Sequence, residues 1–404
     1  MALRLTEPDL LRVVWAMGAA LFSLTALMWA RIRRQVSTPL SAQTPPPVCV
    51  ISACKGVFAQ FDDNIRSLLA QEYEGELEFL FVSPRKDDPA YLALERLLTE
   101  NSAHARPGGR VRASLLCSHA TPVRCSEKIL NMLYALERVP ESSELLVFVD
   151  ADVRAHPRWL RRLVAPLSDA GTLAAAAHAV YLPYAFSLWQ LARLACTGYS
   201  VCGMAVGRVL VGWSWAIRRR DFEKLGIAAL WERVLDDDVA LDRVFARDGR
   251  RLAWACQAGA AFWDECTPTA FQRNFNKAFL WLRYYDPMVW VISMLAVSST
   301  AALILWSLFP PFHPRLLAAL FAVHAVNLGA IFAILRHYLP EQFEGIHPAL
   351  RAFPLWTALC APFVMASYAL AAVNSLYSRE VRWGGYVYRL DGPFDIRVIG
   401  EYRT

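Results

Sequence analysis

The chain has 404 residues, of which 56% are hydrophobic, and its mean hydropathy is +0.28. These values are high for a purely soluble protein and indicate membrane-spanning segments. The net charge is +6, and the basic residues cluster at the edges of apolar segments, which favours contact with anionic lipid headgroups over nucleic acid. The nine cysteines include no C-x-x-C pair, so neither a zinc site nor a disulfide framework is indicated, and a reducing cytosolic environment is expected.

The first apolar stretch, residues 13–30, is uncharged and long enough to cross a bilayer. Acidic residues precede it and three arginines follow it, so the positive-inside rule places the N-terminus outside and the residues after 31 in the cytoplasm. A cleavable signal peptide would carry its positive charge in front of the apolar stretch. We therefore expect residues 1–34 to form an uncleaved transmembrane anchor.

Residues 48–265 have the pattern of one cytoplasmic α/β domain. Short apolar runs predict strands at residues 48–53, 77–83, 113–118 and 145–150, and helical patterns such as 61–71 and 89–99 lie between them. Strands that alternate with helices imply βαβ units and a mainly parallel sheet. No G-x-G-x-x-G follows the first predicted strand, which argues against a dinucleotide-binding Rossmann domain.

The C-terminal third is dominated by apolar segments. Residues 268–286 place phenylalanines on one helical face and basic residues off it, which predicts an amphipathic helix in the membrane interface, with an ordinary helix packed on the core as the alternative. Residues 287–336 predict a transmembrane hairpin. Residues 353–376 form a third apolar segment that contains Pro354 and Pro362. Arg351 and Arg379 lie on either side of it, so one straight span cannot keep both inside. Whether this segment spans the membrane or is re-entrant stays open, and residues 377–404 form a basic-aromatic tail.

Three acidic groups, called the acidic stations below, stand out in the predicted α/β domain. They are Asp87-Asp88, after the second predicted strand, then Asp150-Ala151-Asp152, after the fourth, and Asp236-Asp237-Asp238, at the start of a helical stretch. Carboxylates at the carboxyl ends of parallel strands suit a divalent cation that also holds a phosphate. Each station also has a structural explanation, because Asp-x-Asp often caps a loop and acidic residues stabilise helix starts.

Further short motifs accompany the stations. They are Cys54-Lys55-Gly56-Val57, Ser126-Glu127-Lys128 with Asn131, His178 with Leu182-Pro183-Tyr184, Gly212-Trp213-Ser214 ahead of Arg219-Arg220-Asp221, and Arg382-Trp383-Gly384-Gly385-Tyr386 with Tyr388-Arg389-Leu390. In this order and spacing the chain resembles the family 2 type membrane glycosyltransferases. It is most similar to the ceramide glucosyltransferase family and its bacterial hopanoid and lipid glycosyltransferase relatives. The resemblance runs from the N-terminal anchor to the tail and implies a GT-A type nucleotide-diphospho-sugar transferase domain with membrane helices.

The resemblance implies an inverting, metal-dependent glycosyltransferase. Such an enzyme moves a sugar from a UDP-sugar to the hydroxyl of a ceramide-like or hopanoid-like lipid, here at the cytoplasmic face of the bacterial inner membrane. A divalent cation, Mg²⁺ or Mn²⁺, would neutralise the departing diphosphate, and a carboxylate would take the proton of the acceptor hydroxyl.

The resemblance also assigns roles to residues. Asp238 is the catalytic base; Asp88, Lys128, Asp150, Arg382 and Arg389 bind the donor; Asp152 with Asp150 holds the metal; and His178, Asp237, Lys277 and Trp383 serve the acceptor or the surrounding site. Structural alternatives remain. Lys128 can be a solvated helix lysine, His178 a structural residue, and the tail's arginines and tryptophan juxtamembrane anchors.

One motif departs from the family pattern. A Gln/Arg-x-x-Arg-Trp sequence is expected before the membrane hairpin, and aligned from Phe271-Gln272 only its basic residue is kept, as Lys277, with Trp281 one turn further. This departure argues against a polysaccharide synthase, in which that tryptophan holds the growing chain. The few C-terminal spans argue the same way. A catalytically inactive membrane scaffold is the second alternative, and the survival of all three stations argues against it.

Overall fold

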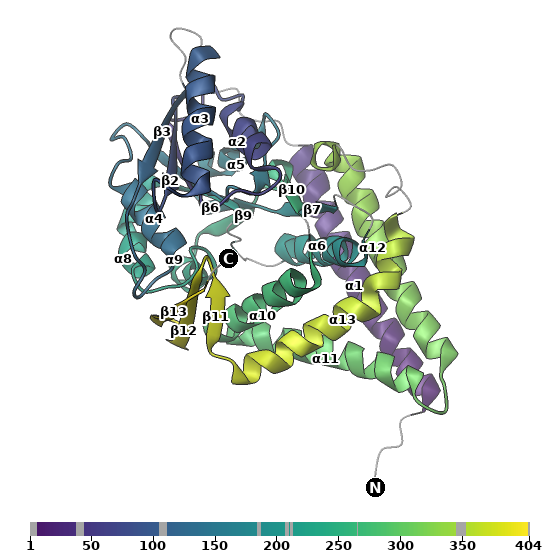
Figure 1. The fold of residues 1–404 in the computed structure, drawn as a ribbon. Coiled ribbons are helices and arrows are strands. Elements are labelled where there is room, and N and C mark those ends of the chain that lie inside the picture. The colour runs from purple at the N-terminus through teal and green to yellow at the C-terminus, as the bar shows by residue number, and fades with distance from the viewer. Residues whose placement is uncertain are drawn as a thin grey trace. The chain divides into compact units, whose positions relative to one another are not determined.

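The computed structural model describes residues 6–37, 44–104, 111–183, 187–206, 210, 213–264, 266–344 and 353–402 (Figure 1). The predictions made for Tyr184, Gly212 and Arg351 fall outside these ranges. The chain divides into two compact units. The helical unit contains residues 1–37, 180–207 and 264–378, and the α/β unit contains residues 38–179, 208–263 and 379–404. The α/β unit therefore takes in the tail, while residues 180–207, within the predicted catalytic domain, belong to the helical unit.

The α/β unit is built on a seven-stranded sheet with the order β3-β2-β1-β4-β8-β6-β9. Its strands are β1 (Val48–Ala53), β2 (Leu77–Ser83), β3 (Val111–Cys117), β4 (Leu145–Val149), β6 (Thr172–Ala177), β8 (Ser214–Arg218) and β9 (Arg251–Trp254). Only β8 runs antiparallel to its neighbours, β4 and β6. The predicted α/β class with a mainly parallel sheet is confirmed.

Apolar runs form the strands because both faces of the sheet are covered. Every residue of β2 and β4 is buried, which is why these strands have no polar alternation. The core includes Phe79, Val147 and Trp159. The unit's helices are α2 (Phe61–Leu69), α3 (Pro89–His104), α4 (Glu127–Leu136), α5 (Trp159–Val164), α7 (Arg219–Lys224), α8 (Ile227–Trp231) and α9 (Asp242–Asp248).

The strand order creates a topological switch point between β1 and β4. From β1 the chain moves outward through β2 to β3, then returns to place β4 on the other side of β1. Ligands in open α/β sheets bind outside the carboxyl ends of the strands at such a point. The loop that begins at Cys54 after β1 and the turn that begins at Asp150 after β4 both lie there.

Two small sheets complete the unit's strands. β5 (Val153–Arg154) pairs antiparallel with β10 (Ala260–Asp264), with Val153 opposite Phe262. The tail forms an antiparallel sheet, called the tail sheet, of β11 (Glu380–Trp383), β12 (Tyr386–Gly392) and β13 (Asp395–Glu401). Its first turn has φ values of +59° at Gly384 and +88° at Gly385, a left-handed conformation that favours glycine at both positions.

The helical unit contains α1 (Glu7–Val36), α6 (Leu188–Val206), α10 (Pro268–Tyr285), α11 (Pro287–Leu308), α12 (Pro314–Tyr338) and α13 (Phe353–Tyr377), and β7 (Ala179–Pro183) lies at its boundary. Within the described residues, α1, α11 and α12 are long and apolar enough to cross a membrane. α11 and α12 pack against each other as the predicted hairpin. α13 is one continuous helix that packs against α6, α10, α11 and α12.

The aromatic face of α10 packs on protein. Phe271 lies 6.0 Å from Phe363 and Phe275 lies 4.2 Å from Tyr368, measured between ring centroids, and both partners belong to α13. The face that was expected to meet lipid is therefore buried against a neighbouring helix. This is the alternative that the sequence left open for residues 268–286.

Neutral polar groups join the long helices. Asn327 of α12 donates a hydrogen bond from Nδ2 to Thr25 Oγ1 of α1, at 2.8 Å. The Tyr199 hydroxyl of α6 lies 2.6 Å from His324 Nδ1 of α12. Thr25, Asn327 and His324 are buried between helices, where a hydrogen bond satisfies polar groups that are removed from water.

Candidate functional site

The second acidic station follows the carboxyl end of β4, and this places it at the switch point between β1 and β4. The backbone N–H of Asp150 donates to the carbonyl of Trp213, at 3.0 Å, at the start of β8. Asn64 of α2 donates from Nδ2 to the carbonyl of Ala151, at 3.4 Å. The turn that carries Asp150 and Asp152 is thus held from two sides.

The third station is almost completely buried. Asp237 is 0% exposed, and its Oδ2 accepts a hydrogen bond from Trp215 Nε1 at 3.4 Å. The Asp237 carbonyl accepts another from Trp231 Nε1 at 3.2 Å. Asp238 caps a short 3₁₀ helix (Val239–Leu241) by accepting from the N–H of Val239. The station therefore starts a helix, as its structural explanation expects, but burial of its carboxylates goes beyond what capping requires.

Lys128 joins the second and third stations. Its Nζ lies 2.6 Å from Asp150 Oδ1 and 2.7 Å from Asp237 Oδ1, and its side chain is 19% exposed. Burial opposes the ammonium charge, but the two carboxylates hold the pKa of Lys128 well above its usual range. Lys128 is therefore not a solvated helix lysine. Its position is fixed by Ser126, which caps α4 by accepting from the N–H of Ile129 at 3.2 Å.

The Asp238 carboxyl titrates in an unusual range. Burial and the charge of Asp237 raise the pKa of Asp238 to about 6, while Lys128 acts in the opposite direction. A general base is most effective when its pKa lies near the working pH. The environment of Asp238 therefore suits proton abstraction from a hydroxyl.

The first station contributes one residue to the switch point. Asp88 Oδ1 accepts hydrogen bonds from the N–H groups of Gly56 and Ala90, both at 2.8 Å. It thereby connects the loop after β1 with the first turn of α3. Asp87 is exposed instead and forms an ion pair with Arg85.

Two further residues at the switch point had no predicted role. Lys55 Nζ lies 2.5 Å from Glu127 Oε2 and donates to the carbonyl of Gly384 at 2.7 Å. Glu127 donates its N–H to the hydroxyl of Tyr388 at 3.3 Å. One signal in the sequence could have identified Lys55. It is a lysine in the loop that follows the first strand, and ligand sites of α/β sheets lie at the carboxyl ends of strands.

The tail sheet brings Trp383, but not the predicted arginines, to the face that meets Lys55 and Glu127. Side chains alternate between the faces of a strand, and residues paired across strands share a face. Trp383 pairs with Tyr386 and shares its face, whereas Arg382 pairs with Val387 on the opposite face. Arg389 also lies on that opposite face, where its Nε is 3.2 Å from Asp391 Oδ1.

The structure also shows the burial or contacts of His178 and Lys277. His178 follows β6, is 1% exposed, and accepts a hydrogen bond at Nδ1 from Trp254 Nε1 at 3.2 Å. Such burial and bonding fit the structural alternative for His178. Lys277 belongs to α10 in the helical unit, and its Nζ lies 4.4 Å from the centre of the Trp281 ring, so the two remnants of the family motif contact each other.

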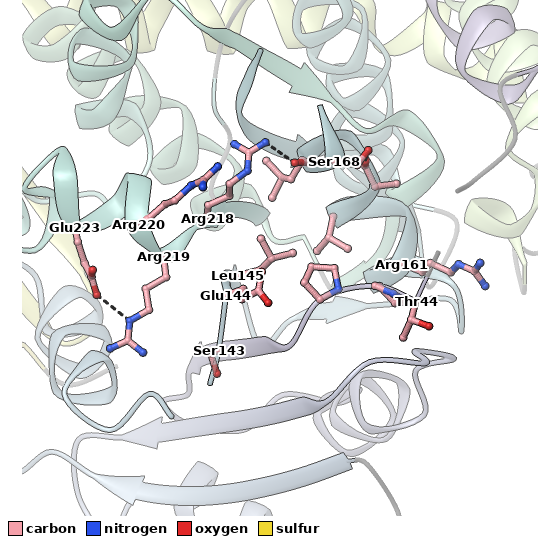
Figure 2. A pocket seen from close by; sticks show the side chains of 15 residues that line it. Thr44, Ser143, Glu144, Leu145, Arg161, Ser168, Arg218, Arg219, Arg220 and Glu223 are labelled. Carbon is pink, nitrogen blue, oxygen red and sulfur yellow. Dashed lines mark hydrogen bonds and ion pairs between the residues drawn. The ribbon is translucent and has the colours of Figure 1, made fainter. Parts of the chain in front are cut away.

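A cavity of about 450 Å³ lies at the opposite edge of the sheet, near the first residue of β4, Leu145 (Figure 2). Arginines line it, but most are already bound within the protein. Arg218 donates to the carbonyls of Thr172 and Asp169, at 2.8 and 2.7 Å, and Arg219 Nε lies 2.8 Å from Glu223 Oε1. Asp150 follows the carboxyl end of β4 and meets Lys128 and Asp237 there, so this cavity, near the amino end of β4, is not part of the stations' site.

Comparison with known proteins places the chain in a family. No curated protein sequence matches the chain significantly. A similar solved structure is the mannosyltransferase PcManGT from Pyrobaculum calidifontis in complex with GDP-Man and Mn²⁺, with 19% sequence identity, coverage of 91% of this chain and 99% of that chain, and a TM-score of 0.46. The family model described as "Glycosyl transferase family 21" matches residues 12–393. The chain therefore belongs to glycosyl transferase family 21 and is a glycosyltransferase, as its motifs predicted.

Proposed function

We propose that this enzyme transfers a sugar, with inversion, from a UDP-sugar to the hydroxyl of a membrane lipid at the cytoplasmic face of the membrane. The observation that carries the proposal is the pair of contacts from Lys128 to Asp150 and Asp237. They gather the stations assigned to donor, metal and base around one half-buried ammonium group at the switch point. A scaffold that had lost its chemistry would have no need to keep these charges buried.

Asp238 would act as the general base. Its pKa of about 6 keeps the carboxyl largely ionised at neutral pH, while burial limits how well water stabilises the charge. Such a carboxylate can accept the proton of an acceptor hydroxyl as the new glycosidic bond forms. Asp237, held by Trp215 and Lys128, would fix the orientation of the station.

Asp152, with Asp150, would hold a divalent cation. Carboxylate oxygens are the donors that Mg²⁺ and Mn²⁺ prefer. Within the described residues no group of three His, Cys, Asp or Glu side chains is arranged as a metal site, so a donor diphosphate would have to supply the remaining ligands. When bound, the cation would neutralise the negative charge that develops on the departing diphosphate.

The acceptor is proposed to be ceramide-like or hopanoid-like. Membership of family 21 and three helices able to cross a membrane support a lipid acceptor. Lys277 and Trp281 contact each other near the expected position of the family motif. The departure of this segment from the motif supports a single transfer over polymer synthesis. Asp88 and Lys128 would contact the donor, and Arg382 and Arg389 remain a prediction because they lie on the outer face of the tail sheet.

The test is nucleotide release by the purified full-length protein in detergent. Wild type, Asp238→Asn and the control Asp62→Asn, an exposed carboxylate paired with Arg96, are compared. The panel covers UDP-glucose, UDP-galactose, UDP-N-acetylglucosamine and GDP-mannose, with ceramide, hopanoid alcohols and diacylglycerol as acceptors. We expect one donor–lipid pair to give metal-dependent turnover that Asp238→Asn lowers by about 10³-fold or more and Asp62→Asn leaves unchanged. Full activity in Asp238→Asn, or in the presence of a chelator, would contradict the assigned base or metal.

A further inference from the structure

The tail sheet meets the α/β core through one compact set of contacts at the switch point. Lys55, from the loop after β1, reaches both Glu127 of α4 and the carbonyl of Gly384 in the turn between β11 and β12. Its ammonium also lies 5.1 Å from the centre of the Tyr386 ring. One lysine thus joins α4 of the core to the turn of the tail sheet.

Glu127 also contacts the tail sheet, through both its backbone and its side chain. Its N–H donates to the Tyr388 hydroxyl, and its carboxylate is hydrogen-bonded to the Tyr386 hydroxyl. The Glu127 side chain is only 7% exposed, so its charge depends on Lys55 and Tyr386 for compensation. A charged hydrogen bond in such a place is stronger than a neutral one and costly to break.

These contacts adjoin the acidic stations along the chain. Lys55 is followed by Gly56, whose N–H is held by Asp88, and Glu127 is followed by Lys128, which binds Asp150 and Asp237. Lys55 and Glu127, which contact the tail sheet, are thus next in the chain to Gly56 and Lys128. A shift of the tail sheet would therefore disturb the contacts of Asp88 and Lys128, which the proposed function assigns to the donor. The sheet's inner face also presents the aromatic side chains of Trp383 and Tyr386 at this edge.

The turn between β11 and β12 has a backbone conformation that favours glycine. At Gly385 φ is +88°, whereas a Cβ there would be in ordinary van der Waals contact with Lys55 Nζ, at 3.5 Å. Together with Gly384, at +59°, Gly385 forms a tight two-residue turn whose carbonyl points at the lysine. The conformation of the turn thus directs the Gly384 carbonyl toward the Lys55 ammonium group.

We propose that Lys55 and Glu127 are positioning residues that fasten the tail sheet over the switch point, where it covers the bound nucleoside diphosphate of the donor. The covering role rests on the proposed function, while the fastening itself does not. The pair does not contact the reacting atoms. It holds the Gly384–Gly385 turn, and with it Trp383 and Tyr386, against the donor end of the sheet.

The experiment measures the fastening and the covering separately on the full-length protein in detergent. Amide hydrogen exchange of residues 380–402 reports the first, and calorimetric binding of UDP or GDP with Mn²⁺ reports the second. The variants are Lys55→Met, Glu127→Gln, the conservative Lys55→Arg, and Tyr386→Phe, which removes only a hydroxyl. The matched control is Glu78→Gln, which changes another buried carboxylate at the amino end of β2. Its Oε2 lies 2.9 Å from Nε of Arg112 on β3.

We expect Lys55→Met and Glu127→Gln to speed exchange in the tail sheet and to weaken nucleotide binding, each by about tenfold, with β1, β2 and β4 still protected. Lys55→Arg should retain most of both properties, Tyr386→Phe should be intermediate, and Glu78→Gln should change neither. Wild-type protection of the tail sheet in Lys55→Met would overturn the fastening. Faster exchange with unchanged nucleotide affinity would overturn the covering role. A wild-type protein that binds neither nucleotide, yet loosens its tail in Lys55→Met, would refute the proposed function and leave the fastening intact.

Discussion

The two units of this protein bury polar groups in opposite ways. In the α/β unit, buried carboxylates have basic partners, as where Asp237 meets the half-buried Lys128 and where Asp221 meets the buried Arg218. In the helical unit, the buried polar side chains that the structure describes are hydroxyls, amides and one imidazole, with no carboxylate, lysine or arginine among them. Neutral groups join helices at low cost in a membrane, whereas buried charge is expensive and is kept where chemistry uses it. The contrast agrees with the proposal that the chemistry takes place in the α/β unit.

Removal of Lys128 should produce the largest effect on stability. In Lys128→Met the buried Asp237 and the half-buried Asp150 lose their common partner, which we expect to cost about 3–5 kcal/mol of unfolding free energy. Denaturant unfolding followed by near-ultraviolet circular dichroism measures the loss. Lys224→Met, an exposed lysine at the end of α7, is the control and should change little. Wild-type stability in Lys128→Met would show that the stations are not held by this ion pair.

Asp238→Asn should stabilise the protein while it removes activity. The folded-state pKa of Asp238 is raised to about 6 from a usual value of 3.8, so ionisation of this carboxyl disfavours the folded state as pH rises through that interval. The variant should therefore match wild type near about pH 4 and gain on the order of 3 kcal/mol above about pH 6. Thermal unfolding of both proteins across this range tests the sign. A gain that is the same at all pH values would refute the linkage to this carboxyl.

A polar deletion in the helical unit should have the smallest effect. Asn327→Leu removes the hydrogen bond to Thr25, and interhelical bonds of this kind contribute about 0.6 kcal/mol on average. The loss should not depend on pH, because neither group titrates. Val326→Leu, at an exposed neighbouring position, controls for packing. A loss as large as that of Lys128→Met would end the contrast between the units.

The sequence carried the fold class and the stations because both are local signals. Apolar runs ended by aspartates identify β4 and its turn, and strands alternating with helices imply a parallel sheet. The partners of those aspartates are not local. Lys128 lies 22 residues before Asp150 and 109 before Asp237 (150 − 128 and 237 − 128), so nothing in its own neighbourhood distinguishes it from a solvated helix lysine.

The tail shows a different limit of sequence reasoning. The family resemblance identified Arg382, Trp383 and Arg389 together, but in a strand the neighbours Arg382 and Trp383 must face opposite ways. Which face meets the core is decided by Tyr388, buried against Glu127, and that contact joins residues far apart in the chain. Residues 180–207 were assigned to the catalytic domain for a similar reason, since the contacts of α6 with α12 and α13 cannot be seen locally.

The discontinuity of the α/β unit has a consequence for biosynthesis. Its last stretch, residues 379–404, is translated only after the segments that form α10 to α13. The sheet that contacts Lys55 and Glu127 is thus the final part of the unit to be made. A nascent chain can therefore complete the contacts of Lys55 and Glu127 only after all of its long apolar helices have been synthesised.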